Sequence, residues 1–165
     1  MTDERRRRRR RRPLFGRHPM TLGALALAGI SGYELWVRLE DFWAWTAGIR
    51  HLSQVRGTPF LQDLGIVFEA PEMRQLAFKL LFLLACVLFG VVCLFRRNKA
   101  RGAWVLFALA AALAGAGLAL GVYAVSSWTQ LVKLVPLALI AIGCVSNRAQ
   151  RRARRARRRR AKSPQ

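Results

Sequence analysis

Residues 75–95 read QLAFKLLFLLACVLFGVVCLF, and Lys79 is the one charged residue in this stretch. A helix needs roughly 20 predominantly apolar residues to cross a hydrocarbon core about 30 Å thick. A buried helix of a small soluble protein is not so uniformly apolar over such a length. The stretch therefore predicts a membrane-spanning helix.

Three further stretches approach or reach the same length, and together they predict an all-α fold. We expect an integral membrane four-helix bundle with a short amphipathic outer helix and disordered basic tails. The third span is as strongly apolar as the second, whereas Glu34 interrupts the first span and Lys133 interrupts the fourth. The expected organisation is a tail at 1–18, spans at about 19–39, 75–95, 103–125 and 128–146, an outer loop at 40–74 and a tail at 147–165.

The 165-residue chain has a net charge of +21 although 53% of its residues are hydrophobic, because its charges are segregated. Nine arginines against two acidic residues give 1–18 a net charge of +7, and four basic residues give 96–101 a charge of +4. Ten basic residues give 148–165 a charge of +10, whereas 38–74 has a net charge of −1. Basic loops stay on the cytoplasmic side. We expect both termini in the cytoplasm and the bundle in the plasma membrane, or in the inner membrane if the source is bacterial.

The eight consecutive arginines at 5–12 are first a topology signal. We also expect the Arg-rich tails to bind anionic lipids, because basic residues near such a surface each contribute about 1 kcal/mol. Specific nucleic-acid binding is the weaker interpretation, since no aromatic residues alternate with the arginines to stack on bases. A cleaved leader is a further alternative, because a basic segment precedes the apolar residues 23–32. Cleavage would leave three spans.

The outer loop contains two apolar segments. Residues 41–55 keep one helical face apolar and are rich in tryptophan, which predicts a short amphipathic helix on the outer face, either continuous with the first span or packed on the span tops. Residues 60–68 are too short to cross and are expected at the interface or as a cap on the bundle. Pro71 fits the first turn of the next helix. Ser127–Gln130 fits a capping box that starts the fourth span.

Small residues recur at intervals of four in two spans, and such stripes let helix backbones approach closely in lipid. We expect them to pack helices within the monomer, and a homo-oligomer interface is the alternative. The candidate packing residues are Ala24, Ala28 and Gly32 in the first span and Gly117 and Gly121 in the third.

Three charged residues form a candidate intramembrane ionic layer: Glu34, Lys79 and Lys133. Counted along their helices, all three lie roughly 6–8 Å below the outer boundary of the membrane. A charge at this depth is normally paired or faces a cavity. One interpretation is an outward-facing polar pocket for an anion or a proton. The other is a structural pair that fixes helix register, with any unpaired lysine reaching for the interface. Pro136, close to Lys133, is expected to bend or loosen the fourth span.

No pattern in the sequence predicts catalysis, a cofactor or a metal site. The three cysteines, Cys86, Cys93 and Cys144, form no CxxC motif and are expected to pack as small apolar residues. His18 and His51 fall on opposite sides of the membrane. No nucleotide-binding, hydrolase or metalloprotease motif is present.

The sequence predicts a non-enzymatic accessory or scaffolding subunit of a membrane assembly that acts through a membrane-protein partner. The alternative is a small transporter or channel that uses the ionic layer, and a membrane enzyme is a remote third. A water-filled cavity shared by the three charges would favour transport.

Overall fold

A computed structural model describes residues 18–96 and 102–160, and every element in these ranges is a helix. The elements are α2 (His18–Arg56), α3 (Phe60–Glu69), α4 (Pro71–Arg96), α5 (Ala103–Ala119), α6 (Trp128–Leu131), the 3-10 turn η1 (Val132–Leu134) and α7 (Val135–Arg160). The predictions for residues 1–17, 97–101 and 161–165 lie outside the described residues.

Three helical segments are long and apolar enough to cross a membrane: α2, α4 up to Phe95, and Trp128–Ala149, which runs from α6 into α7. The apolar α5 is shorter, with 17 residues. It ends before the predicted boundary at 125 because Gly121 takes a left-handed conformation, with φ 65°. The carbonyl of Gly117 then accepts hydrogen bonds from the amides of Val122 (2.9 Å) and Tyr123 (3.1 Å) and closes the helix end.

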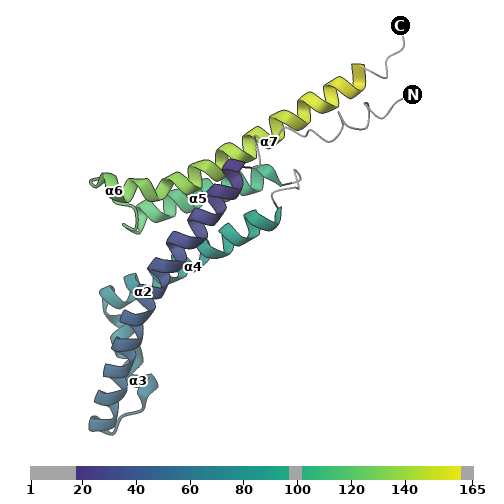
Figure 1. Ribbon diagram of the computed structural model, residues 1–165. Helices are drawn as coiled ribbons and strands as arrows, with labels where there is room; N and C mark the ends of the chain where they lie inside the picture. Colours follow the sequence, from purple (N-terminus) through teal and green to yellow (C-terminus); the bar gives the residue numbers. More distant parts are fainter. Residues whose placement is uncertain (1–17, 97–101, 161–165) are drawn as a thin grey trace.

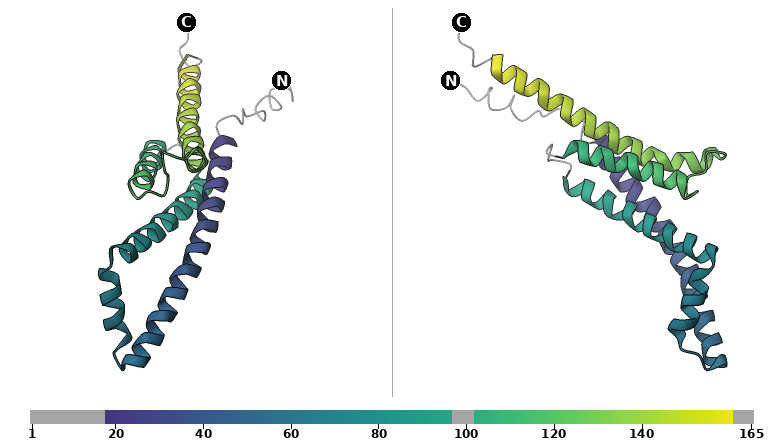
Figure 2. Two further views of the ribbon diagram at one scale, coloured as in Figure 1. Left: turned by 90° about the vertical axis from the view of Figure 1, so that its left-hand side faces the viewer. Right: turned by 180° about the vertical axis from the view of Figure 1, so that it is seen from behind.

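The helix α2 lies at the centre of the arrangement, with α4 and α7 packed against it and α5 packed against α7 (Figures 1 and 2). Chain direction alternates: α2 runs away from the end where it begins, α4 returns, α5 runs away again and α7 returns (Figure 1). The helices α4 and α5 pack together less extensively than α5 and α7 do. A contact between the second and third spans lies near the far end of α5, where the rings of Phe82 and Tyr123 meet edge to face at 5.8 Å.

The core is formed where these four helices meet. Its buried side chains are Met20, Ala24 and Leu27 from α2; Phe82, Leu83, Cys86, Phe89 and Cys93 from α4; Leu106 and Ala110 from α5; Val122 and Tyr123 from the following turn; and Leu137, Ile140 and Cys144 from α7. All three cysteines are free and buried, and they pack in this core.

The outer half of α2, together with α3 and the first turn of α4, forms an arm that projects away from the other helices (Figures 1 and 2). Residues 41–55 are therefore not a separate helix but the continuation of the first span, since α2 is unbroken over 39 residues. The chain turns at Gly57, with φ 68°. Thr58 Oγ1 then donates a 2.5 Å hydrogen bond to the carboxylate of Asp63, which ties the turn to the first turn of α3.

Two predicted helix starts have different outcomes. Pro71 begins α4, as predicted. Ser127 precedes α6, but the predicted capping box does not form. The Ser127 hydroxyl pairs with Thr129 Oγ1 at 2.8 Å instead. The backbone carbonyl of Ser127 accepts hydrogen bonds from the amides of Gln130 and Leu131.

The tail at 147–165 was expected to be disordered. That prediction is wrong for residues 147–160, because α7 continues to Arg160. Arginine and alanine, which dominate this segment, are both strong helix formers. Cations near the C-terminal end of a helix also interact favourably with its dipole. In this segment, helix propensity outweighs the repulsion between neighbouring arginines.

Candidate functional site

Two of the three predicted ionic-layer residues meet. Glu34 of α2 forms an ion pair with Lys133 of η1, and this pair links the central helix to the start of the last span. The two side chains have relative exposures of 21% and 27%, so the pair is largely withdrawn from the surface. The contact neutralises both charges at a helix crossing, which is the arrangement that a charge within a span requires.

Lys79 does not join this pair. It lies in α4, partly exposed, and forms no ion pair with any residue that the structure describes. The two tyrosines also differ, because Tyr33 is 72% exposed whereas Tyr123 is buried, with its hydroxyl 4.0 Å from Cys86 Sγ. The predicted layer of three charges is thus a single pair with a separate lysine.

Pro136 explains why Lys133 reaches Glu34. A proline has no N–H group, and its ring excludes the carbonyl of the residue four positions earlier, here Val132. The three residues Val132–Leu134 accordingly form a 3-10 turn between α6 and α7. Because a 3-10 turn has three residues per turn, it rotates Lys133 relative to a continuous α-helix.

The small residues of the first span face α4. A Cβ atom built on Gly90 of α4 would lie 2.9 Å from the backbone oxygen of Ala24 and 3.1 Å from Cβ of Ala28. The backbones of α2 and α4 are therefore in close approach at these two alanines. Gly32 lies further along α2, where the nearest side-chain atom to its Cβ position is that of Val87 at 4.0 Å.

The two glycines of the third span have different roles. A Cβ on Gly117 would meet the ring of Tyr123 and would lie 2.9 Å from Cζ of Phe82 in α4, so this glycine makes room for both rings. Gly121 has open space around its Cβ position, and its positive φ makes it a turn residue instead of a packing residue. The GxxxG spacing therefore does not mark one continuous packing face, because Gly117 alone of the two meets other side chains.

The closest helix approach was missed by the sequence analysis. A Cβ on Gly23 of α2 would lie 2.6 Å from the backbone oxygen of Pro136, and a Cβ on Gly143 of α7 would lie 2.6 Å from Cβ of Met20. Gly143 is the one glycine of α7, and Gly23 lies outside the four-residue spacing of Ala24, Ala28 and Gly32. A glycine inside an apolar span is too weak a sequence signal to predict which neighbouring helix it faces.

The arm carries exposed apolar side chains outside the core. A shallow pocket between α2 and α3 is lined by Ala44, Trp45, Gly48, Ile49, Leu52 and Val67. Around it, large apolar residues are at least half exposed: Trp43, Trp45, Leu52, Val55, Leu61 and Ile66. We call this set the arm surface.

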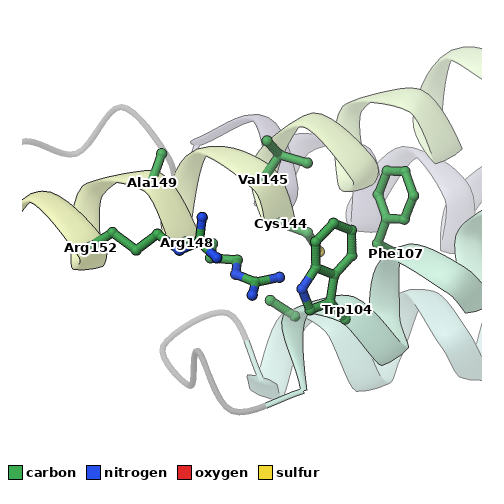
Figure 3. Close-up of a pocket in the computed structure, with 8 residues that line it drawn as sticks. Trp104, Phe107, Cys144, Val145, Arg148, Ala149 and Arg152 are labelled. Atoms are coloured by element: carbon green, nitrogen blue, oxygen red, sulfur yellow. The ribbon is translucent and has the colours of Figure 1, made fainter.

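A second pocket lies at the opposite end of the molecule, between the start of α5 and the C-terminal half of α7 (Figure 3). The guanidinium carbon of Arg148 lies 4.4 Å from the centre of the Trp104 ring. Sequence reasoning missed this pocket. The available signal was that Trp104 and Arg148 lie at the same predicted membrane boundary on neighbouring spans.

The two pockets lie apart from the predicted ionic layer. No group of three or more metal-ligating side chains lies within the described ranges 18–96 and 102–160. Neither the arm pocket nor the α5–α7 pocket is lined by Glu34, Lys79 or Lys133.

Comparison with known proteins adds no relative. No protein-family model matches the chain, and no match was found among curated proteins or among solved structures.

Proposed function

We propose that this protein crosses the plasma membrane four times, with both termini in the cytoplasm, and acts as a non-enzymatic accessory or scaffolding subunit of a membrane assembly. Alternation of chain direction supports four crossings. The long helices α4 and α7 run the same way, so the chain must cross back between them, and α5 runs in the required direction (Figure 1). At 17 residues α5 is about 25 Å long, close to the hydrocarbon thickness.

The orientation is supported by charge. The beginning of α2, the end of α4, the beginning of α5 and the basic half of α7 lie at one end of the molecule (Figures 1 and 2). The six acidic residues between Glu34 and Glu72 lie in or near the arm. The positive-inside pattern then places the arm outside the cytoplasm.

The proposal of an accessory subunit is based on the arm surface. With 39 residues, α2 is about 58 Å long, nearly twice the length needed to cross a membrane about 30 Å thick. Its outer half therefore extends beyond the bilayer if α2 crosses upright. Trp43 (67% exposed), Val55 (72%) and Leu61 (77%) are apolar side chains that water would surround there. Exposed clusters of this kind, enriched in aromatic residues, are typical of protein interfaces.

We therefore assign the extracytoplasmic part of a second membrane protein as the partner of the arm surface. Charged residues border the apolar ones, among them Glu40, Asp41, Arg50 and Arg56. A border of both signs matches the polar rim of a protein interface better than it matches a lipid surface.

The proposal is tested by site-specific photocrosslinking in native membranes. A photoreactive residue at Leu61 should give a discrete crosslinked protein band, whereas the same residue at Leu88, which is 57% exposed on the membrane-spanning part of α4, should crosslink to lipid. The double substitution Trp43→Ser with Trp45→Ser should abolish the Leu61 band. The control Trp128→Ser removes a tryptophan that is 84% exposed outside the arm, and it should leave the band intact. The absence of a protein band at Leu61, or its persistence in the double variant, would contradict the proposal.

Transport through the ionic layer receives less support from the geometry. Glu34 and Lys133 neutralise each other, Lys79 stands apart, and the pockets described above lie elsewhere. The pair is better explained as a clamp between α2 and the last span.

A further inference from the structure

The pocket between α5 and α7 combines positive charge with apolar walls. Arg148 and Arg152 are one turn apart on α7, and both line the pocket with Trp104, Phe107 and Val145. Figure 3 shows the Arg148 guanidinium beside the Trp104 indole, with the Arg152 side chain extending along α7 toward Arg148. This pocket plays no part in the proposed binding of a partner by the arm.

Arg148 has an unused donor. Its Nη1 atom is buried and has no hydrogen-bond acceptor within the described part of the chain. A buried polar group without a partner destabilises a fold, and more so when it is charged. The face of Trp104 attracts the guanidinium as a cation–π contact but does not accept a directional hydrogen bond from that nitrogen. Arg148 is therefore held in position while its hydrogen-bonding capacity stays available.

Nothing in the described chain supplies a counter-charge here. The acidic residues of the described ranges lie between Glu34 and Glu72, in α2, α3 and the first turn of α4. Like charges four residues apart on a helix repel each other. The pocket also contains the beginning of α5, where Ala103 and Trp104 belong to the first turn and the first amide that bonds within the helix is that of Leu106, to Gly102. The amides of a first turn and the positive end of the helix dipole favour an anion.

We propose that this pocket binds the phosphate group of an anionic amphiphile, with Arg148 and Arg152 contacting the phosphate oxygens. Arginine suits this role because its planar guanidinium can donate two parallel hydrogen bonds to a phosphate. The apolar lining indicates what adjoins the phosphate. Trp104 is 58% exposed and Val145 is 51% exposed along the same groove, so an acyl chain can lie against them. A membrane phospholipid supplies both parts, and a soluble phosphate ester supplies only the first.

The site differs in kind from binding of lipid by the Arg-rich tails. Tail arginines in water are screened by salt, with a Debye length of roughly 3 Å at 1 M. Arg148, which is half-buried, is screened much less than an arginine in water. Salt therefore separates the two modes of binding.

The test uses the full chain in a neutral detergent and titrates it with dioctanoyl phosphatidylglycerol, with calorimetry as the readout. The buffer contains about 0.5 M salt, because the Debye length is then only a few ångströms and binding by exposed arginines is screened. We expect one saturable site. Arg148→Gln should weaken its affinity roughly tenfold or more, because a charged hydrogen bond is lost. Arg152→Gln should weaken it less, and it serves as the second variant if Arg148→Gln does not fold, which circular dichroism reports. Arg158→Gln is the matched control, since it removes the same charge from the same helix ten residues beyond Arg148.

A parallel titration with glycerol phosphate distinguishes the two sources. Saturation by the lipid alone identifies a phospholipid site, whereas equal binding of glycerol phosphate identifies a soluble phosphate ester. Either result, when sensitive to Arg148, supports the phosphate site. Equal loss in Arg148→Gln and Arg158→Gln, or no saturable binding of either compound in 0.5 M salt, would overturn it. A failure here leaves the arm crosslinks unaffected, so the two proposals fail separately.

Discussion

The two halves of α2 have the same helical backbone but different surroundings. The inner half buries Met20, Ala24 and Leu27 against α4 and α7. The outer half lies only against α3 and the first turns of α4, and its buried residues are Ile49 and Ser53. Helix formation is therefore a local property along all 39 residues, whereas burial depends on which neighbours the fold supplies.

The inner half of α2 therefore packs the bundle, whereas the outer half supports the exposed side chains of the arm surface. In the bundle, Gly23, Gly90 and Gly143 bring backbones into contact and leave no space for an additional atom. In the arm, by contrast, Gly48 has no atom within 4 Å of its Cβ position. Substitutions should accordingly have large effects in the bundle and small ones in the arm.

The largest effect is expected at the tightest contact, where α2 crosses α7. Gly23→Leu should lower the free energy of unfolding by about 3 kcal/mol, the upper range for overpacking, because the new Cβ meets the Pro136 backbone oxygen at 2.6 Å. The measurement is an SDS titration in mixed micelles followed by circular dichroism. Gly29→Leu is the matched control on the same helix. It meets no atom within 4 Å and should be neutral or slightly stabilising. Equal effects of the two changes would contradict the close crossing of α2 and α7.

An intermediate effect is expected where the two halves of α2 meet. Glu34→Gln should lower the unfolding free energy by about 1–2 kcal/mol, because Lys133 loses its counter-charge in a partly exposed setting. The same SDS titration measures it. The double variant Glu34→Lys with Lys133→Glu should regain part of the loss. Lys79→Gln, at a lysine without an ion pair in the described chain, should change stability by less than about 0.5 kcal/mol. A loss at Lys79 as large as that at Glu34 would argue against a two-residue pair.

The smallest effect is expected in the arm and should be local. Asp63→Ala removes the acceptor of the Thr58 hydroxyl and the negative charge in the first turn of α3, and it should cost about 0.5–1 kcal/mol there. Hydrogen exchange should become faster over Phe60–Glu69 and stay unchanged in α7. Asp41→Ala, at an exposed aspartate of α2, is the control. Faster exchange in α7 would show that the arm and the bundle are not separate units.

The sequence predicts the features of this fold that depend on local chemistry. Apolar runs identified the three helical segments that are long and apolar enough to cross a membrane. Pro71 identified the start of α4, and Pro136 identified the irregular turn before α7. Each of these depends on residues adjacent in the chain. The continuity of α2 into the arm also had a local signal, because 33–56 contains no proline and Gly48 as its one glycine.

Features that depend on helix rotation could not be predicted. Glu34 had two candidate lysines at similar depth, and only the three-dimensional crossing of α2 with the start of the last span selects Lys133. The same reason explains Gly23 and Gly143, whose close contacts come from the other helix. Repulsion within the C-terminal tail predicted disorder, but helix propensity was underestimated, and α7 extends to Arg160.

The unbroken α2 has a mechanical consequence. A continuous helix resists bending, and α2 lies against both α4 and α7 near its inner end while its outer end carries the arm surface. Because the backbones of α2 and α7 are in close contact at Gly23, α2 cannot shift there without displacing α7. A partner that displaces the arm sideways therefore applies force at the crossing of α2 and α7. Because α2 has no break between the arm and this crossing, the displacement is transmitted to its inner end.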